Sequence, residues 1–318
     1  MRYLRSAIAA AAALLFSAAA HAEFPDKPVT LIVPFAAGGS NDILARHLGD
    51  GLSKIWGQPV VVNNMPGAGA AIGSAHVSKA APDGYTLLIA SVTFTMNPAV
   101  QPNLPFDPRK DFQPVAMLGQ VPLVLVVGKA LEAKTVQELV ATAKKQELNY
   151  ADSGLGTVNQ FGAELFAQSA GITLTPVHYK GGSEAMTAVI GGHSDMFMSS
   201  MTQALPLIRG GQLRGLVVTG KERATVVPDI PTTDEAGIPG VDVQQWWGIM
   251  APAGTPMDVV EKLNADINKV MSTEATKEFL ARDAGRPTPM SVQEFSDLIS
   301  AQLKKWPEVA DKAGIKIE

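Results

Sequence analysis

The regular alternation of short apolar runs with longer amphipathic runs constrains the fold of this chain more than any other feature. Val29-Thr-Leu-Ile-Val33 is typical of a buried strand, and 40–56 carries apolar side chains at helical spacing on one face. Further strands are predicted at 60–63, 86–90 and 114–118, and a second series of strands and helices runs from 123 to 218. Such alternation predicts βα units that build mainly parallel sheets.

The length and the order of these segments predict two lobes. The chain has 318 residues, more than one hydrophobic core usually serves. After 218 it holds one more strand-like segment at 243–250 and then two or three helices. We therefore expect a lobe of 122–241 and a discontinuous lobe of 23–121 plus 242–318. Two crossings, near 119–124 and 238–246, would join them as a hinge.

The first residues have the pattern of a secretory signal. Arg2 and Arg5 precede an apolar, alanine-rich stretch that ends in Ala20-His21-Ala22, the small-x-small pattern that signal peptidases cut. The apolar part is about 15 residues long, short of the roughly 20 that a spanning helix needs. We expect 1–22 to be a signal peptide cleaved after Ala22, which sends the mature chain to the periplasm. With no cysteine, that chain has neither a cysteine-linked lipid nor disulfides.

Composition and motif searches argue against several classes of function. A net charge of −4 without a clustered basic face excludes a nucleic-acid partner. No Gly-x-Ser-x-Gly motif occurs, and the histidines form no HxxxH pair, so we expect no catalytic residue and no metal. The glycines of 67–73 follow GxGxxxG spacing and lack a following acidic residue, which departs from the dinucleotide-binding pattern. We expect no cofactor.

Two glycine-rich loops, one in each predicted lobe, are candidates for anion binding. The first, 34–42, joins a strand to a helix, and the second, 149–157, does the same in the other lobe. Glycines allow backbone N–H groups to point outward, and a helix N-terminus carries a partial positive charge. The two loops could grip one carboxylate ligand from opposite sides of a cleft. The alternative is a tight turn in which Ser40 caps the helix.

Several motifs in one order resemble the solute receptors of tripartite tricarboxylate transporters, also called Bug or TctC-type receptors. The motifs are Phe24-Pro-Asp-Lys-Pro28, Ile32-Val-Pro-Phe-Ala-Ala-Gly-Gly39, Asn64-Met-Pro-Gly-Ala-Gly69, Ala81-Pro-Asp-Gly-Tyr85, Ser153-Gly-Leu-Gly-Thr157, Tyr179-Lys-Gly181 and Ala251-Pro-Ala-Gly-Thr-Pro256. The resemblance implies an α/β, type II periplasmic-binding-protein fold, with two βα lobes joined by a two-crossing hinge around a ligand cleft. It implies a monomer that binds a carboxylate, amino acid or aromatic acid and delivers it to membrane transporter subunits.

The resemblance also implies which residues contact the ligand. In the first loop they are Phe35, Ala37, Gly38, Gly39, Ser40 and Asp42; in the second they are Ser153, Gly156 and Thr157. Ser91, Thr93 and Lys180 stand where the family commonly lines its cleft. The chain departs from the family pattern at Asp152, Gln160 and Ser199, and we expect these residues to contact the far end of the ligand.

Asp152 and the biological role each leave alternatives open. An ionised Asp152 beside the cradle would repel a second ligand carboxylate by about 4 kcal/mol at 4 Å, which would select monocarboxylates or acids with a polar group. Alternatively it points away and caps the following turn. We expect a receptor that captures a small organic acid for transport and is not an enzyme. The alternatives are a ligand-binding sensor subunit and a periplasmic hydrolase or lyase of organic acids, for which no pair of base and nucleophile is visible.

Overall fold

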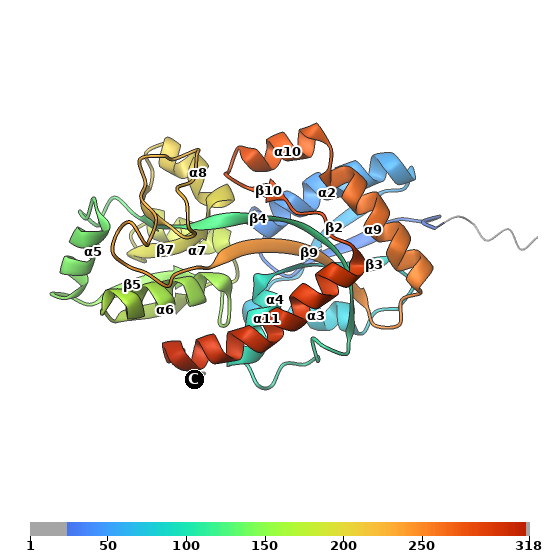
Figure 1. Cartoon of the computed structure of the whole chain (residues 1–318), viewed down its shortest axis with the longest axis horizontal. Helices are drawn as coiled ribbons and strands as arrows, with labels where there is room; N and C mark the ends of the chain where they lie inside the picture. Colours follow the sequence, from blue (N-terminus) through green and yellow to red (C-terminus); the bar gives the residue numbers. More distant parts are fainter. Residues whose placement is uncertain (1–23, 316–318) are drawn as a thin grey trace, which may run out of the picture.

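A continuous sheet of ten strands organises residues 24–315, the part of the chain that the computed structural model describes (Figure 1). The expected cleavage after Ala22 lies outside the described residues. The strand order is β2-β1-β3-β9-β4-β7-β5-β6, and β8 and β10 also pair with β4. The strands are β1 (Val29–Val33), β2 (Val60–Asn64), β3 (Thr86–Ser91), β4 (Phe112–Val127), β5 (Leu148–Asp152), β6 (Leu174–His178), β7 (Met196–Ser200), β8 (Arg214–Val218), β9 (Gln244–Pro252) and β10 (Arg286–Pro287).

Strand β4 belongs to both lobes. Its first part, 112–122, pairs antiparallel with β9, whereas Leu123 to Val127 pair with β7 on one side and β8 on the other. The sequence predicts two separate strands here, 114–118 and 123–127. That expectation is wrong, since β4 is one strand in which Pro122 still lies opposite Gln244, with irregularities in register at 114–116 and 117–119.

The sheet is less parallel than the sequence predicts. Strand β1 pairs parallel with β2 and β3 in one lobe, and β5 pairs parallel with β6 and β7 in the other. The remaining pairs are antiparallel, and each contains β4 or β9. Of these two, β4 continues from one sheet into the other, where it runs antiparallel to β7 and β8, whereas β9 pairs only with β3 and the first part of β4. The change of partner at 122–123 falls inside the expected crossing, while the limits of the two lobes stay a prediction.

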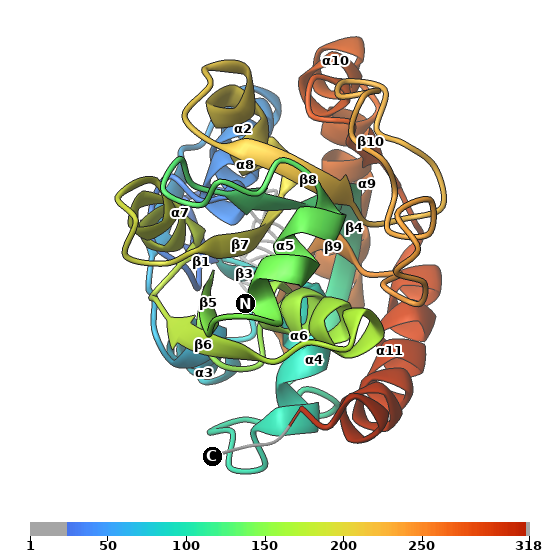
Figure 2. The same cartoon turned by 90° about the vertical axis from the view of Figure 1, so that its left-hand side faces the viewer.

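Helices cover both faces of the sheet (Figures 1 and 2). Alternate residues of β1 face different cores, with Leu31 and Val33 in one and Ile32 in the other. The helices are α2 (Ser40–Trp56), η1 (Ala68–Ala70), α3 (Ala71–Ser78), α4 (Val92–Val100), α5 (Val136–Ala143), α6 (Val158–Ala170), α7 (Gly182–Ile190), α8 (Met201–Arg209), α9 (Met257–Met271), α10 (Glu274–Ala281) and α11 (Val292–Ala313). Within the described ranges, no helix is both long enough and apolar enough to cross a membrane.

Helix α4 is a feature that the sequence pattern does not predict. It holds two β-branched threonines and Pro98, a composition that disfavours an isolated helix. Its stability comes from tertiary contacts, because α11 packs along it and the Thr95 hydroxyl donates to Gln302 Oε1 of α11 at 2.9 Å. Packing therefore overrides local propensity at the point where β3 ends.

We expect Gly248→Ala in β9 to destabilise the fold. A methyl group at this buried glycine would collide with the ring of Phe295 and approach the Ala116 carbonyl oxygen to 3.0 Å. Overpacking of this kind costs about 1–3 kcal/mol, which urea denaturation would measure as a lower free energy of unfolding. A second substitution, Phe295→Leu, should restore part of the loss. Additive losses in the double variant would contradict this account.

Candidate ligand-binding site

Five helices begin at one cleft between the lobes. The first residues of α2, α4, α6, α7 and α8 are Ser40, Val92, Val158, Gly182 and Met201. Each start lies in or directly beside the cleft lining. The lining residues are Phe35, Gly39, Ser40, Asn41, Ser91, Thr93, Ser153, Val158, Asn159, Gly182, Ser200, Gln203 and Gln245. Helix N-termini present unsatisfied N–H groups and a positive dipole end, so their convergence favours an anion.

The lining is polar but carries no charged side chain. Hydroxyl groups come from serines and a threonine, and amide groups come from Asn41, Asn159, Gln203 and Gln245. An anion here would be held by neutral donors and helix dipoles rather than by an ion pair. Within the described ranges, no group of three or more His, Cys, Asp or Glu side chains is arranged to hold a metal ion.

The two lobes meet directly around this cleft. The Val158 N–H donates to Thr93 Oγ1 at 3.2 Å, and Gln101 Nε2 donates to the Leu155 carbonyl at 2.7 Å. At the rim, Ser183 Oγ donates to the Ala37 carbonyl at 2.9 Å. The space in which the centre of a water molecule fits is only about 20 Å³. The lobes are therefore closed, and a solute can enter only after they separate.

The closed contact depends on glycine. A methyl group at Gly69, on one lobe, would collide with the Leu155 carbonyl oxygen on the other. Gly69 has a φ of 58°, a conformation that also disfavours a side chain. Backbone therefore packs against backbone where the loop after β5 crosses to the opposite lobe.

The structure places six of the predicted ligand residues in the cleft lining. They are Phe35, Gly39, Ser40, Ser91, Thr93 and Ser153. The remaining nine lie outside it: Ala37, Gly38, Asp42, Asp152, Gly156, Thr157, Gln160, Lys180 and Ser199. Several of these nine hold the two loops in shape, so their expected contact with a ligand stays a prediction.

Asp42 braces the first loop. Its carboxylate accepts the Gly38 N–H at 2.9 Å and two bonds from Arg46, the shorter at 2.8 Å. Burial alone would raise the pKa of Asp42, but the bonds from Arg46 and Gly38 outweigh burial and hold that pKa below its ordinary value. Nearby, the Asn64 amide donates to the Phe35 carbonyl at 3.0 Å. These bonds fix the turn that brings Gly39 and Ser40 to the cleft.

Asp152 and its neighbours brace the second loop. The fully buried Asp152 carboxylate accepts the Gly154 N–H at 2.7 Å and lies 2.8 Å from His178 Nδ1. Thr157 Oγ1 donates to the Gly154 carbonyl at 2.7 Å, and Gln160 Oε1 accepts the Gly156 N–H at 2.7 Å. This is the turn-capping arrangement that the sequence left open beside ligand selection.

Lys180 and Ser199 also make contacts away from the cleft. The Lys180 backbone N–H donates to Glu184 at 3.2 Å, and its side chain is exposed. The Ser199 hydroxyl donates to the Ser200 carbonyl at 3.2 Å. Behind the second loop, Tyr150 donates to Glu164 at 2.5 Å, and burial raises the pKa of both groups.

Sequence reasoning missed seven lining residues: Asn41, Val158, Asn159, Gly182, Ser200, Gln203 and Gln245. Asn41, Val158 and Asn159 lie in or directly after the two glycine-rich loops, whereas Ser200 and Gln203 lie at a helix start that no glycine-rich loop precedes. Asn41 Oδ1 and Ser200 Oγ are buried without a hydrogen-bond partner in the structure. Buried polar atoms without partners are uncommon, and in a cleft they indicate where a bound molecule completes the bonding.

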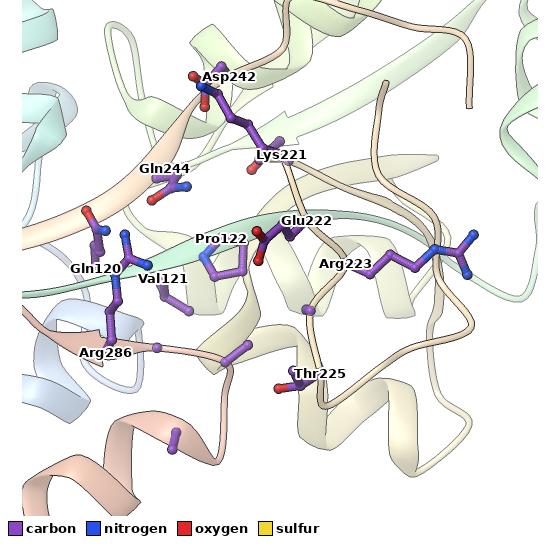
Figure 3. A pocket seen from close by; sticks show the side chains of 16 residues that line it. Gln120, Val121, Pro122, Lys221, Glu222, Arg223, Thr225, Asp242, Gln244 and Arg286 are labelled. Atoms are coloured by element: carbon purple, nitrogen blue, oxygen red, sulfur yellow. The ribbon is translucent and has the colours of Figure 1, made fainter. Parts of the chain in front are cut away.

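A larger groove lies on the other side of the hinge strands (Figure 3). Gln245 lines the cleft and Gln244 lines this groove, because neighbouring residues of a strand point to opposite faces. The groove has a volume of about 540 Å³ and is lined by side chains of both charges, including Lys221, Glu222 and Arg286. The end of α10 lies beside it, so it lacks the helix N-termini that favour an anion in the cleft.

Comparison with known proteins assigns the family. The pattern of the tripartite tricarboxylate transporter family receptor, TctC, matches residues 44–315. Protein BugT of Bordetella pertussis is 34% identical over 299 residues, which cover 93% of this chain and 92% of BugT. A protein encoded in the tcbD-tcbE intergenic region of Pseudomonas sp. strain P51 is 35% identical over 289 residues, covering 90% of this chain and 86% of its own length.

Solved structures agree with this assignment and confirm the predicted periplasmic-binding-protein fold. The periplasmic binding protein BugD has a TM-score of 0.90 at 29% identity, with coverage of 93% of this chain and 100% of BugD. R. palustris Rpa4515 with adipate has a TM-score of 0.89 at 32% identity, covering 92% of this chain and 99% of that protein. MatC from Rhodopseudomonas palustris with bound malate has a TM-score of 0.86 at 33% identity, covering 90% and 99%. The resemblance drawn from the motifs is thereby confirmed, and the chain belongs to the TctC family of solute-binding receptors for tripartite tricarboxylate transporters.

Proposed function

We propose that this receptor captures one small carboxylate between its lobes in the periplasm and presents it to the membrane subunits of its transporter. The observation that carries the proposal is the convergence of five helix N-termini on an uncharged polar cleft. The adipate bound to Rpa4515 and the malate bound to MatC support a carboxylate as the ligand class. Export with cleavage after Ala22 and action as a monomer belong to the same proposal.

In this proposal the receptor responds to its ligand by closing the two lobes. A solute that contacts both lobes binds the closed form better than the open form, and this differential affinity shifts the population toward closure. The lobes in this proposal are 23–121 plus 242–318 and 122–241. A sensor subunit would use the same closed surface, and nothing in the cleft favours it over a transporter partner.

The proposal includes no catalysis. A hydrolase or lyase needs a base within hydrogen-bond reach of a nucleophile or an acidic proton. The cleft lining holds serines and a threonine but no His, Asp, Glu or Lys side chain. Asp42 and Asp152, in the two loops beside the cleft, accept hydrogen bonds from backbone N–H groups of their own loops.

A ligand screen tests the proposed function. Gently purified receptor would be denatured and the released small molecules identified by mass spectrometry, and a panel of organic acids would be screened by thermal shift. A ligand at 100 times its Kd stabilises the folded state by about 2.7 kcal/mol. We expect small carboxylates to raise the melting temperature and their uncharged amides to leave it unchanged. Stabilisation by neutral sugars or by the amides would contradict the proposal.

We expect Thr93→Val to weaken binding of any carboxylate that the screen identifies. The substitution keeps the shape of the side chain but removes the acceptor of the cross-lobe bond from Val158. Losing one such bond costs about 0.5–1.5 kcal/mol, or about 2- to 13-fold in Kd by calorimetry. Thr175→Val, on the edge strand β6, is the matched control, because its hydroxyl bonds Glu147 instead. Equal Kd values for the two variants would show that Thr93 does not contribute to closure around the ligand.

We expect Asp152→Ser to lower stability without changing the order of ligand affinities. The substitution takes away the carboxylate that holds the Gly154 N–H and His178, and an unpaired buried N–H costs about 1–3 kcal/mol. Asp195→Ser is the control, since that carboxylate accepts the Asn149 N–H at the start of the same strand. A changed preference between mono- and dicarboxylates in the Asp152 variant alone would favour ligand selection over loop support.

A further inference from the structure

We propose that Asn41 and Ser200 in the cleft recognise a hydroxyl group on the carboxylate ligand, which acts as a neutral hydrogen-bond donor. The inference rests on the proposed function and narrows its ligand class. Both side chains line the cleft, Asn41 in the first turn of α2 on one lobe and Ser200 directly before α8 on the other. A group held between them would be contacted by both lobes at once.

The unsatisfied atoms define what the ligand must supply. Asn41 and Ser200 are 7% and 4% exposed, and neither Asn41 Oδ1 nor Ser200 Oγ has a partner. An amide oxygen can only accept a hydrogen bond, while a serine hydroxyl can accept or donate. A carboxylate oxygen can only accept, so a ligand made of carboxylates alone would leave Asn41 Oδ1 unsatisfied. The ligand therefore needs a donor close to its carboxylate.

The neutral lining favours a hydroxyl over an ammonium group as this donor. A buried ammonium group requires a nearby carboxylate, and none lines the cleft. A hydroxyl group can donate to Asn41 Oδ1 and accept from Ser200 Oγ without adding charge.

Matched acids test the inference by calorimetry. Malate, succinate and aspartate differ only in a hydroxyl, a hydrogen or an ammonium group, and lactate, propionate and alanine form a shorter series. In the series that the receptor binds, we expect the affinity for the hydroxy acid to exceed that for its deoxy analogue by about 5- to 150-fold. This range corresponds to the free-energy cost of leaving one buried acceptor unsatisfied. Equal affinity for hydroxy and deoxy acids, or a preference for the ammonium compound, would overturn the inference while leaving carboxylate capture intact.

Two variants locate the selectivity. Asn41→Leu should reduce the preference for the hydroxy acid while retaining affinity for the deoxy acid. Asn268→Leu is the control, because its Oδ1 is also without a partner but it lies on α9 outside the cleft lining. Undiminished selectivity in folded Asn41→Leu would contradict the assignment, whereas failure of every carboxylate in the panel to bind the wild type would reject the proposed function.

The groove behind the hinge carries a second, independent inference. We infer that Glu222 and Arg286 form an ion pair when the cleft opens. Glu222 lies in the loop after β8 on one lobe, and Arg286 lies on β10, which pairs with β4 in the other. Figure 3 shows the Glu222 carboxylate pointing across the groove toward the Arg286 guanidinium, with Pro122 of the hinge strand between them.

Hinge geometry links this pair to the state of the cleft. The cleft and the groove lie on opposite faces of β9, so a rotation that opens the cleft narrows the groove. In the closed state, the ion pairs of the described residues include Arg223 with Glu235 at 2.7 Å but not Glu222 with Arg286. An attraction that forms only on opening stabilises the open receptor and so reduces its apparent ligand affinity.

Removing one charge tests the open-state pair. We expect Glu222→Gln to tighten ligand binding by about 1.4- to 5-fold at low salt, the range for exposed ion pairs, with a smaller effect at high salt. The charge-exchanged variant, Glu222→Arg with Arg286→Glu, should return to the wild-type Kd. Glu261→Gln, an exposed acid on α9, is the control. Unchanged or weaker binding by Glu222→Gln would overturn the inference. X-ray scattering gives a second test, because the ligand-free variant should have a smaller radius of gyration than the ligand-free wild type, and an equal or larger value would also overturn the inference.

Discussion

The antiparallel pair of β4 and β9 is the constraint on which the rest of this structure depends. It runs from Phe112 opposite Pro252 to Pro122 opposite Gln244, and β4 then continues into the sheet of the other lobe. The pair therefore joins the lobes at 122–123, where β4 exchanges β9 for β7 and β8 as its partners. Its two faces become a ligand cleft on one side and a charged groove on the other.

Around this hinge the charged side chains lie apart from the surface that contacts the solute. Carboxylates such as Asp42 and Asp152 lie one layer behind the cleft and hold the loops by accepting backbone N–H groups. The surface that faces the solute is built from hydroxyls, amides and helix N-termini. Taking an ion pair out of water carries a desolvation penalty that neutral donors avoid. A receptor that must also release its solute benefits from an attraction of this moderate strength.

Sequence reasoning reached the fold because its main signals are local. The helix 40–56 and the strand 29–33 match the observed α2 and β1, and the family motifs lead to the two-lobed architecture. It failed where contacts distant in sequence decide the outcome. Separate strands are expected at 114–118 and 123–127, yet pairing with β9 continues as far as Pro122 and the two form one strand. The threonine-rich α4 exists because α11 packs on it.

The site was predicted in part for the same reason. Gly39, Ser40 and Ser153 follow a glycine pattern that a sequence displays. Asn41 and Gln203 carry no pattern of their own and become recognisable only when the helix starts meet in space. Conversely, Thr157 and Gln160 lie in the predicted segment, where their side chains bond the backbone of the loop. A one-dimensional motif identifies a loop, whereas the direction of each side chain depends on the fold around it.

The uncharged lining has a consequence for the environment in which such a receptor works. The periplasm exchanges small solutes with the medium, so its acidity follows that of the surroundings. Serine, threonine, asparagine and glutamine side chains do not titrate over the biological range, and they supply the polar side chains of this cleft. Proton uptake by the lining therefore contributes nothing to the binding free energy. Any dependence of ligand affinity on pH then comes from the ionisation of the solute itself, and the affinity for the ionised solute is the same in acidic and in neutral water.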